Sequence, residues 1–247
     1  MRIEHAQVSM IGHREDNQDR CAVAANVHSA LIMAIDGMGG HAGGALAAET
    51  ARTSLLASFA SQQQPLFDPI GFLHLALGRA HDDVAALGKG IPLEHRPRAT
   101  CALALVQDGA AYWAHIGDSR IYHVRDGSVR TRTRDHSHVE ILLREGLITE
   151  AEVQYHPMRN FVECCLGGDA TIPEMSISQR QRLEPGDVLM VCSDGLWANL
   201  RDSDIAATWR NGGPAFQVAL EELALQAVAA SSPYSDNVTA AALRWLG

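Results

Sequence analysis

The chain has 247 residues, of which 47% are hydrophobic and 20% charged, so it can bury a substantial core and is not intrinsically disordered. Its formal net charge of -9 argues against nonspecific binding to nucleic acids or to anionic membranes. No apolar run is long enough to span a membrane, the N-terminus lacks the apolar core of a signal peptide, and the five cysteines show no metal-type spacing. These features predict a cytoplasmic protein with reduced thiols.

The first polar stretch of the chain lies between two strand-like segments. Residues 3–10 predict a strand, and a densely polar stretch at 12–20 follows, which contains Arg14 and Asp19. The planar fork of an arginine suits phosphate oxygens, but a polar stretch between strands is usually a solvated loop. By itself this stretch is a weak signal.

The next strand-like segment, residues 31–35, ends abruptly at Asp36 and Gly37. A carboxylate there is costly to desolvate unless a positive charge meets it, and a glycine lets the backbone approach a ligand closely. The stretch is either the rim of a sheet that holds a cation or an ordinary strand-to-helix turn. Because Asp-Gly turns are common, the stretch alone favours the turn.

Helical and hairpin patterns follow. Residues 43–60 and 73–87 have apolar positions spaced by three and four, which predicts two amphipathic helices packed on a sheet. Asp-Gly pairs at 108–109 and 126–127 each separate two apolar runs, which is a strong hairpin signal and indicates an antiparallel sheet. Between the hairpins lies Asp118, a second aspartate at a strand end.

Residues 135–169 break the strand pattern. Asp135 or Ser137 is suited to cap a short helix, and a capping-box sequence at 149–152 starts another. This predicts an insertion of short helices and loops. Such insertions often lie over an active site, although this one is equally compatible with a mere connection.

Two more aspartates mark strand ends near the C-terminus. The strand-like run 187–192 leads to Asp194, and Asp236 precedes the last strand-like run. Helices are expected at 202–209 and 214–230 between them. Because the end of one antiparallel strand and the start of its neighbour share a rim, the sequence predicts that four aspartates converge. No repeat or linker divides the chain, so a single domain is expected over 1–247.

Several carboxylates at one rim repel one another, and divalent cations remove that repulsion. Ligation by oxygen alone suits Mg²⁺ or Mn²⁺ rather than Zn²⁺. Two such ions about 3.5–4 Å apart bind a bridging water, lower its pKa and direct it at an electrophile. With an arginine nearby, a phosphate ester is the natural electrophile. Residue chemistry thus predicts metal-assisted phosphoester hydrolysis.

Five motifs in fixed order resemble those of a known family: Arg14-x-x-Asn17-Gln18-Asp19, Asp36-Gly37-Met38-Gly39-Gly40-His41, Gly117-Asp118-Ser119-Arg120, Ser193-Asp194-Gly195 and Asp236-Asn237-Val238-Thr239. The chain resembles the PPM family of metal-dependent Ser/Thr protein phosphatases, type 2C, in its compact bacterial form. The resemblance covers about residues 5–243. It implies an α+β fold, a four-layer α-β-β-α sandwich of two antiparallel sheets flanked by helices, with residues 135–169 as the family's mobile flap.

The resemblance also implies a role for each motif residue. Asp36 resembles the carboxylate that bridges two core ions of Mn²⁺ or Mg²⁺, and Gly37 offers a carbonyl ligand. Arg14 resembles the phosphate-binding arginine. The further implied metal-site residues are Asp194 and Asp236 at the second core ion, Asp19 acting through water, Asp118 with Asp194 at a third, weaker ion, and Asn237 in support.

Two positions depart from the pattern of animal members. Gln18 replaces a glutamate, so one direct ligand becomes water, and Met38 replaces a histidine proposed as general acid. His41 lies nearby, but the sequence does not establish that it substitutes. Both departures also occur in bacterial relatives.

The expected function is hydrolysis of phosphoserine and phosphothreonine in proteins by direct attack of the metal-bridging water. Expected partners are phosphoprotein substrates and a separate Ser/Thr kinase, with no nucleic acid and no membrane, and the chain is expected to be a monomer. Two alternatives stay open: a catalytically weak phosphopeptide-binding pseudophosphatase, and a regulatory phosphatase with one narrow substrate.

Overall fold

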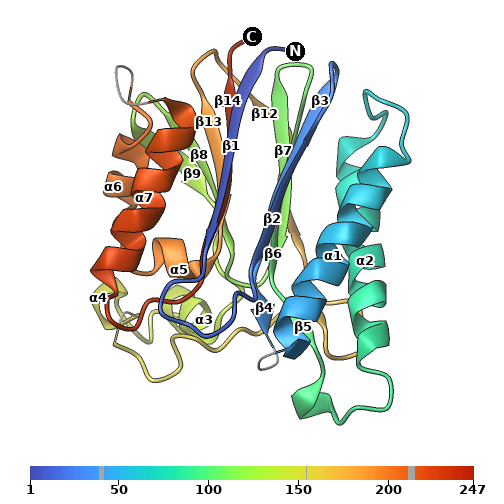
Figure 1. Cartoon of the computed structure of the whole chain (residues 1–247), viewed down its shortest axis with the longest axis vertical. Coiled ribbons are helices and arrows are strands. Elements are labelled where there is room, and N and C mark those ends of the chain that lie inside the picture. Colours follow the sequence, from blue (N-terminus) through green and yellow to red (C-terminus); the bar gives the residue numbers. More distant parts are fainter. Residues whose placement is uncertain (39–41, 154, 211–214) are drawn as a thin grey trace.

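The computed structural model describes residues 1–38, 42–153, 155–210 and 215–247. Two antiparallel sheets pack face to face, and helices cover the outer face of each (Figure 1). The predicted α-β-β-α sandwich is therefore confirmed.

The first sheet lies under the two long helices α1 (Ala42–Ala60) and α2 (Pro69–Leu87). Alternation along its central strand explains its two faces: Leu31, Met33 and Ile35 face these helices, whereas Ile32 faces the other sheet. Its strands, in spatial order, are β11 (Ser176–Ile177), β7 (Ala110–Ile116), β6 (Cys101–Gln107), β3 (Ser29–Ile35) and β2 (Arg20–Ala25), and β12 (Gln181–Arg182) also pairs with β7.

The second sheet lies under the C-terminal helices α5 (Asp194–Trp197), α6 (Asp202–Ala207) and α7 (Phe216–Ala230). Met190 packs towards these helices, and its neighbours Leu189 and Val191 pack between the sheets. The strand order is β1 (Ile3–Met10), β14 (Val238–Trp245), β13 (Val188–Cys192), β8 (Arg120–Arg125) and β9 (Ser128–Arg132).

Both Asp-Gly hairpins form as expected. Asp108 and Asp126 have φ values of 50° and 52°, and each is followed by a glycine with positive φ, which is the backbone that a two-residue hairpin turn requires. The hairpins nevertheless lie in different sheets, because β6 and β7 belong to the first sheet and β8 and β9 to the second. The chain therefore crosses from one sheet to the other at residues 117–119.

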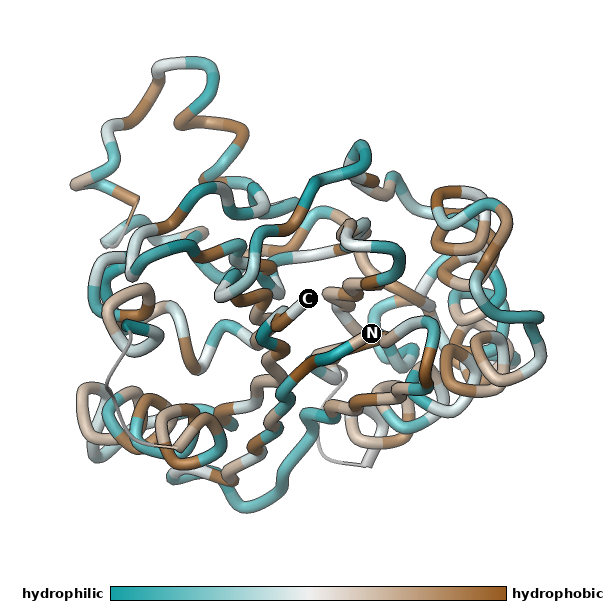
Figure 2. The backbone as a smooth tube through the Cα atoms, turned by 90° about the horizontal axis from the view of Figure 1, so that it is seen from above, coloured by the Kyte–Doolittle hydropathy of each residue, from teal (hydrophilic) through white to brown (hydrophobic). Residues whose placement is uncertain are grey.

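The two termini lie side by side at one end of the sandwich. The backbone N–H of Arg2 donates to the carbonyl of Gly247, and Figure 2 shows both ends together when the molecule is viewed from above. At the opposite end lie η1 (Leu93–His95), α3 (His138–Arg144), α4 (Glu150–Val153) and a small sheet of β4 (Gly37–Met38), β5 (Arg98–Ala99) and β10 (Leu166–Gly167) (Figure 1).

The insertion at 135–169 is tied together at its base. Ser137, rather than Asp135, caps α3, because its hydroxyl accepts the backbone N–H of Glu140. The backbone N–H of His138 donates to the carbonyl of Phe161, so the two ends of the insertion meet.

Several helix limits differ from the sequence expectation, and α2 already begins at Pro69, four residues before the predicted stretch 73–87. The helix expected at 202–209 ends at Ala207, and within the described residues the helix expected from 214 starts at Phe216. In the described ranges, no helix combines the length and the hydrophobicity needed to cross a membrane.

Candidate active site

The four aspartates that end or begin strands meet at the rim of the sandwich opposite the termini. Asp36 follows β3, Asp118 lies in the crossing between β7 and β8, Asp194 follows β13, and Asp236 precedes β14. A cleft of about 750 Å³ is lined by all four side chains. The predicted convergence of these aspartates is therefore confirmed.

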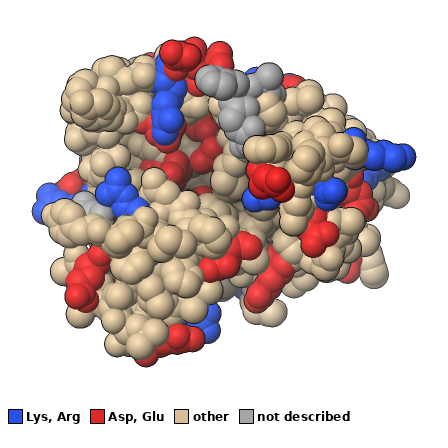
Figure 3. Space-filling view, turned by 90° about the horizontal axis from the view of Figure 1, so that it is seen from below, with Lys and Arg blue, Asp and Glu red and all other residues tan. Residues whose placement is uncertain are grey.

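A second cleft of about 550 Å³ adjoins the first and shares five lining residues with it: Arg14, Asp118, Asn160, Asp194 and Asp236. Residues of the 135–169 insertion form part of its wall, among them Val139 and Glu150. Viewed from below, acidic side chains gather in a hollow with basic side chains at its edge (Figure 3). This rim therefore carries two adjoining clefts that have acidic side chains in common.

Thr100 holds the backbone of Asp36. The N–H of Thr100 donates to the carbonyl of Asp36 at 2.8 Å, and the Thr100 hydroxyl accepts the N–H of Asp36 at 3.3 Å. The same hydroxyl shares a 2.7 Å hydrogen bond with Ser119. Because Thr100 and Ser119 are completely buried, this bridge fixes Asp36 relative to the turn that contains Asp118.

Gly37 lies where no side chain fits. A Cβ atom at this position would overlap the carbonyl oxygen of Gly44 and lie 2.7 Å from the carbonyl oxygen of Gln18. A glycine is therefore required for the chain to pass this close to two other backbone segments directly after Asp36.

Asp19 lies behind the cleft rather than in its wall. Its side chain is 3% exposed, and its carboxylate accepts the hydroxyl of Ser193 at 2.6 Å. Burial raises the pKa of the Asp19 carboxyl to about 7, although the bond from Ser193 lowers it. Ser193 belongs to the Ser193-Asp194-Gly195 motif, but the sequence assigned it no role of its own.

Three carboxyls in the wall of the cleft, those of Asp36, Asp118 and Asp194, also have raised pKa values. Burial and the neighbouring charges of Asp19, Asp194, Asp118 and Asp236 raise the pKa of Asp36 well above its usual range. Burial and the charge of Asp194 likewise raise the pKa of Asp118. Burial and the charge of Asp236 raise the pKa of Asp194 to about 6. A cation in the cleft would relieve this repulsion.

Arg14 forms an ion pair with one of these aspartates. Its Nη2 lies 2.6 Å from Oδ2 of Asp236, and the two side chains are 58% and 41% exposed. A pair this exposed contributes about 0–1 kcal/mol to stability. The Arg14 guanidinium can therefore leave Asp236 and bind another anion at little cost.

Asn237 supports the loop that carries Arg14. Its side-chain oxygen accepts the N–H of Gln18 at 2.8 Å, and its amide donates to the carbonyls of Ile11 and Asp16, both at 2.9 Å. Asn237 therefore holds the loop 11–18 against the start of β14.

Gln18 and Met38, the two departures from the animal pattern, both line the 750 Å³ cleft. His41 lies outside the described residues. The structure adds Asn160, Asp135 and Trp197 to the wall of the 550 Å³ cleft, and the sequence had assigned none of these three to the site.

The donor atoms of the site fit a hard divalent cation. Asp36, Gly37, Asp194 and Asp236, which offer carboxylate and carbonyl oxygens, line the larger cleft. His13 lines it too, but its Nδ1 is hydrogen bonded to the Ser235 hydroxyl at 2.6 Å. Within the part of the chain that the structure describes, no three His, Cys, Asp or Glu side chains are already gathered as metal ligands.

Comparison with known proteins gives consistent results. A family model of protein phosphatase 2C matches residues 6–231. The chain is 33% identical over 202 residues to the protein phosphatase PhpP of Streptococcus pneumoniae, which covers 78% of each protein. It matches the S. agalactiae serine/threonine phosphatase with a TM-score of 0.89 and 29% identity over 100% of both chains. It matches the catalytic domain of the serine threonine protein phosphatase PstP, in complex with 2 manganese ions, with a TM-score of 0.82 and 27% identity over 99% of both chains.

These matches cover most of the chain, and the aspartate-lined cleft lies where the five motifs meet. The chain belongs to the protein phosphatase 2C family.

Proposed function

We propose that this phosphatase hydrolyses phosphoserine and phosphothreonine esters in proteins at the aspartate-lined cleft. The observation that carries the proposal is the convergence of Asp36, Asp118, Asp194 and Asp236 beside Arg14 at one rim. The matching structure of the PstP catalytic domain is in complex with 2 manganese ions, which supports a requirement for divalent metal. Such ions, when bound, supply the positive field that makes water a nucleophile at neutral pH.

We propose that Asp36, Gly37, Asp194 and Asp236 hold two core ions of Mn²⁺ or Mg²⁺, with Asp19 behind them and Asn237 in support. Asp118 and Asp194 hold a third, weaker ion. Arg14 binds the phosphate, because its fork matches two phosphate oxygens and its pairing with Asp236 is exposed and weak. Thr100 and Ser193 keep Asp36 and Asp19 in place.

We further propose that residues 1–247 form one catalytic domain in which 135–169 act as a flap. Val139, Glu150 and Asn160 of this segment line the 550 Å³ cleft, so the segment is placed to contact the substrate peptide. All five cysteines are unpaired, which supports a cytoplasmic location. Finally, we propose that the enzyme is a monomer and that it removes the phosphate groups that a separate Ser/Thr kinase adds.

Turnover on a phosphothreonine peptide tests this function. We expect many turnovers per enzyme molecule with Mn²⁺ and none in excess EDTA, because the reaction needs the field of the cation. One turnover or fewer would favour a phosphopeptide-binding module instead. Full activity in EDTA would refute the requirement for metal.

Replacing Arg14 by Ala is expected to raise KM for phosphopeptides by about 10–150-fold, because a lost bond between charged groups costs roughly 1.5–3 kcal/mol. The affinity for Mn²⁺ should change little. Steady-state kinetics and calorimetry measure the two quantities, and Arg201→Ala, at an exposed arginine that pairs with Asp204, is the control. An unchanged KM on several peptides would make Arg14 a structural ion-pair partner only.

Replacing Asp118 by Ala tests whether Asp118 acts as a metal ligand or only as a turn residue. A ligand of the weaker ion should leave the melting temperature and the two tight Mn²⁺ sites unchanged. Activity should fall about 100-fold on phosphothreonine peptide, whose alkoxide leaving group needs a proton, and less on p-nitrophenyl phosphate. A turn residue would instead lower stability by about 0.5–2 kcal/mol and affect both substrates equally.

A further inference from the structure

Trp197 connects two of the aspartates directly. It is the last residue of α5, the short helix that Asp194 begins, and its side chain lines the 550 Å³ cleft. The indole Nε1–H donates to the backbone carbonyl of Asp118 at 3.0 Å. This bond joins the segment that carries Asp194 to the crossing between the sheets that carries Asp118.

Arg120 covers one face of this indole. Its guanidinium carbon lies 3.3 Å from the centre of the Trp197 ring. The same guanidinium donates from Nε and Nη2 to the two carboxylate oxygens of Asp135, both at 2.8 Å. The Arg120 and Asp135 side chains are only 12% and 8% exposed, so water screens this two-point contact little. The stack and the ion pair together fix the orientation of the indole.

The same crossing is also held to the base of the insertion. The N–H of His136 donates to the carbonyl of Gly117 at 2.9 Å, and the N–H of Gly117 donates to Nδ1 of His136 at 3.3 Å. The backbone on both sides of Asp118 is therefore fixed, by His136 before it and by Trp197 at its own carbonyl.

Simple packing does not account for the indole bond. Trp209 is 4% exposed, and its Nε1 has no hydrogen-bond partner among the described residues. This fold therefore tolerates a buried indole N–H without a partner. Trp197 is less buried and yet directs its N–H at the carbonyl of an aspartate in the site.

We propose that Trp197 is a positioning residue that sets the separation between Asp118 and Asp194, with Arg120 and Asp135 holding its ring. The inference rests on the proposed function, in which these two aspartates share the weaker ion. In this role Trp197 acts on the ion through the backbone of Asp118. Loss of such supporting contacts typically lowers metal affinity by about 10–100-fold.

The test is Trp197→Phe, which removes the N–H donor and keeps an aromatic ring under Arg120. Mn²⁺ binding is measured by calorimetry, and phosphothreonine peptide hydrolysis is measured as a function of Mn²⁺ concentration. We expect the Kd of the weaker site to rise about 10-fold or more. The Mn²⁺ concentration for half-maximal activity should rise by the same factor, whereas the tight sites and kcat at saturating Mn²⁺ stay unchanged.

Trp209→Phe is the matched control and should leave the weaker site at its wild-type affinity. Arg120→Lys is a second variant that keeps the indole but loses the planar fork, and we expect it to weaken the same site to a smaller extent. Equal loss of affinity in Trp197→Phe and Trp209→Phe would show a general packing effect and overturn the proposal.

Asp118→Ala distinguishes failure of this inference from failure of the proposed function. If that variant loses the weaker site while Trp197→Phe keeps it at full affinity, the positioning role is refuted and the assignment of Asp118 stands. If Asp118→Ala binds Mn²⁺ as the wild type does, the third-ion assignment is wrong, and the positioning role falls with it.

Discussion

Replacing Asp36 by Asn is expected to reduce kcat on a phosphothreonine peptide by about 1,000-fold at saturating Mn²⁺, equivalent to about 4 kcal/mol. Asp36 lies at the centre of the proposed site, since burial and four neighbouring aspartates all raise its pKa. A neutral amide supports two adjacent dications poorly, so the field that makes water a nucleophile is weakened. Near-wild-type turnover would rule out a bridging role for Asp36.

The same variant should be more stable than the wild type in EDTA at pH 7. Because the folded state raises the pKa of Asp36, ionisation of this carboxyl opposes folding at every pH above its unfolded value, about 3.9. Asn carries no charge and removes that opposition. The gain in melting temperature should shrink as the pH falls towards 4, where the unfolded carboxyl also takes up its proton.

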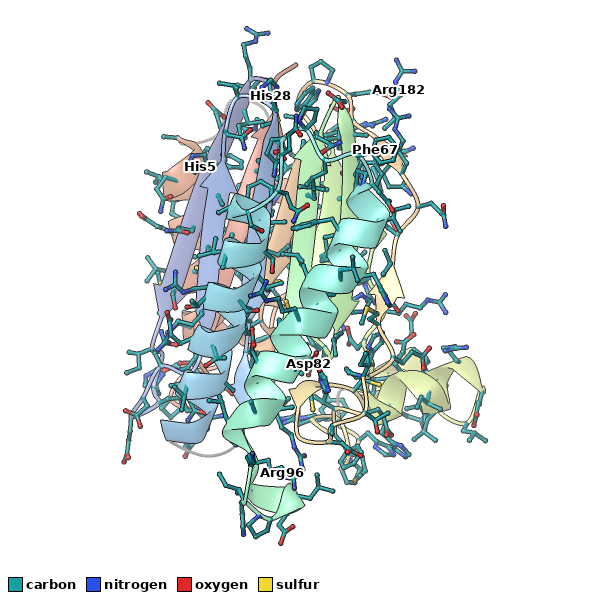
Figure 4. The ribbon with its side chains drawn as sticks, turned by 90° about the vertical axis from the view of Figure 1, so that its right-hand side faces the viewer. His5, His28, Phe67, Asp82, Arg96 and Arg182 are labelled. Atoms are coloured by element: carbon teal, nitrogen blue, oxygen red, sulfur yellow. The ribbon has the colours of Figure 1, made fainter. Side chains whose placement is uncertain are left out.

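Asp82→Asn is the control for this comparison. Asp82 is exposed on α2 and is labelled in Figure 4, and it lines neither cleft. Its replacement should change the melting temperature in EDTA by little and leave turnover intact. A gain in stability of the same size in both variants would reflect the high net negative charge of the chain, not crowding at the site.

Replacing Asp187 by Asn is expected to lower the free energy of unfolding by about 3 kcal/mol, at the lower end of the range for breaking a buried ion pair. Asp187 is 1% exposed and receives two hydrogen bonds of 2.7 Å from Arg125 and one of 3.0 Å from His123. An amide leaves Arg125 with the exposed carboxylate of Glu184 as its remaining counter-charge. For a chain of this length the melting temperature should fall by about 6–12 °C, while turnover per folded molecule stays unchanged.

The loss of unfolding free energy in Asp187→Asn should also depend on pH. Burial favours a higher pKa for Asp187, but the hydrogen bonds from Arg125, the Glu184 N–H and His123 outweigh it and hold the pKa below its usual value. A depressed pKa stabilises the fold above the unfolded pKa, and this contribution is lost as the pH falls through the folded value. The difference between wild type and Asp187→Asn in urea unfolding should therefore narrow below about pH 4.

The chain contains a matched exposed pair for comparison. Arg201 contacts Asp204 through Nε and Nη2 at 2.8 and 3.0 Å, the same two-point geometry, but the side chains are 82% and 41% exposed. Asp204→Asn should cost no more than about 1 kcal/mol, because water screens the pair. Equal losses in the two variants would mean that burial adds nothing at Asp187.

Several features of this protein could be predicted from short segments of sequence, without knowledge of any long-range contact. The Asp-Gly turns needed only two residues with positive φ, and they formed where the sequence placed them. The central strand was readable because Leu31–Ile35 is apolar on both faces, as a strand packed between helices and a second sheet must be. The convergence of the aspartates followed from a similar rule, since strand ends in antiparallel sheets share rims.

Only the tertiary structure decided which groups those local elements meet. Both hairpins have the same turn sequence, yet they lie in different sheets, because sheet membership depends on pairing with distant strands such as β3 and β13. The partners of Asp135 and Trp197 also could not be predicted from the sequence. Arg120 and Asp135 are 15 residues apart, and Trp197 lies 79 residues from Asp118, so no local spacing records these contacts. Turns and strand ends are properties of short segments, whereas a hydrogen bond across two layers exists only after both layers have packed.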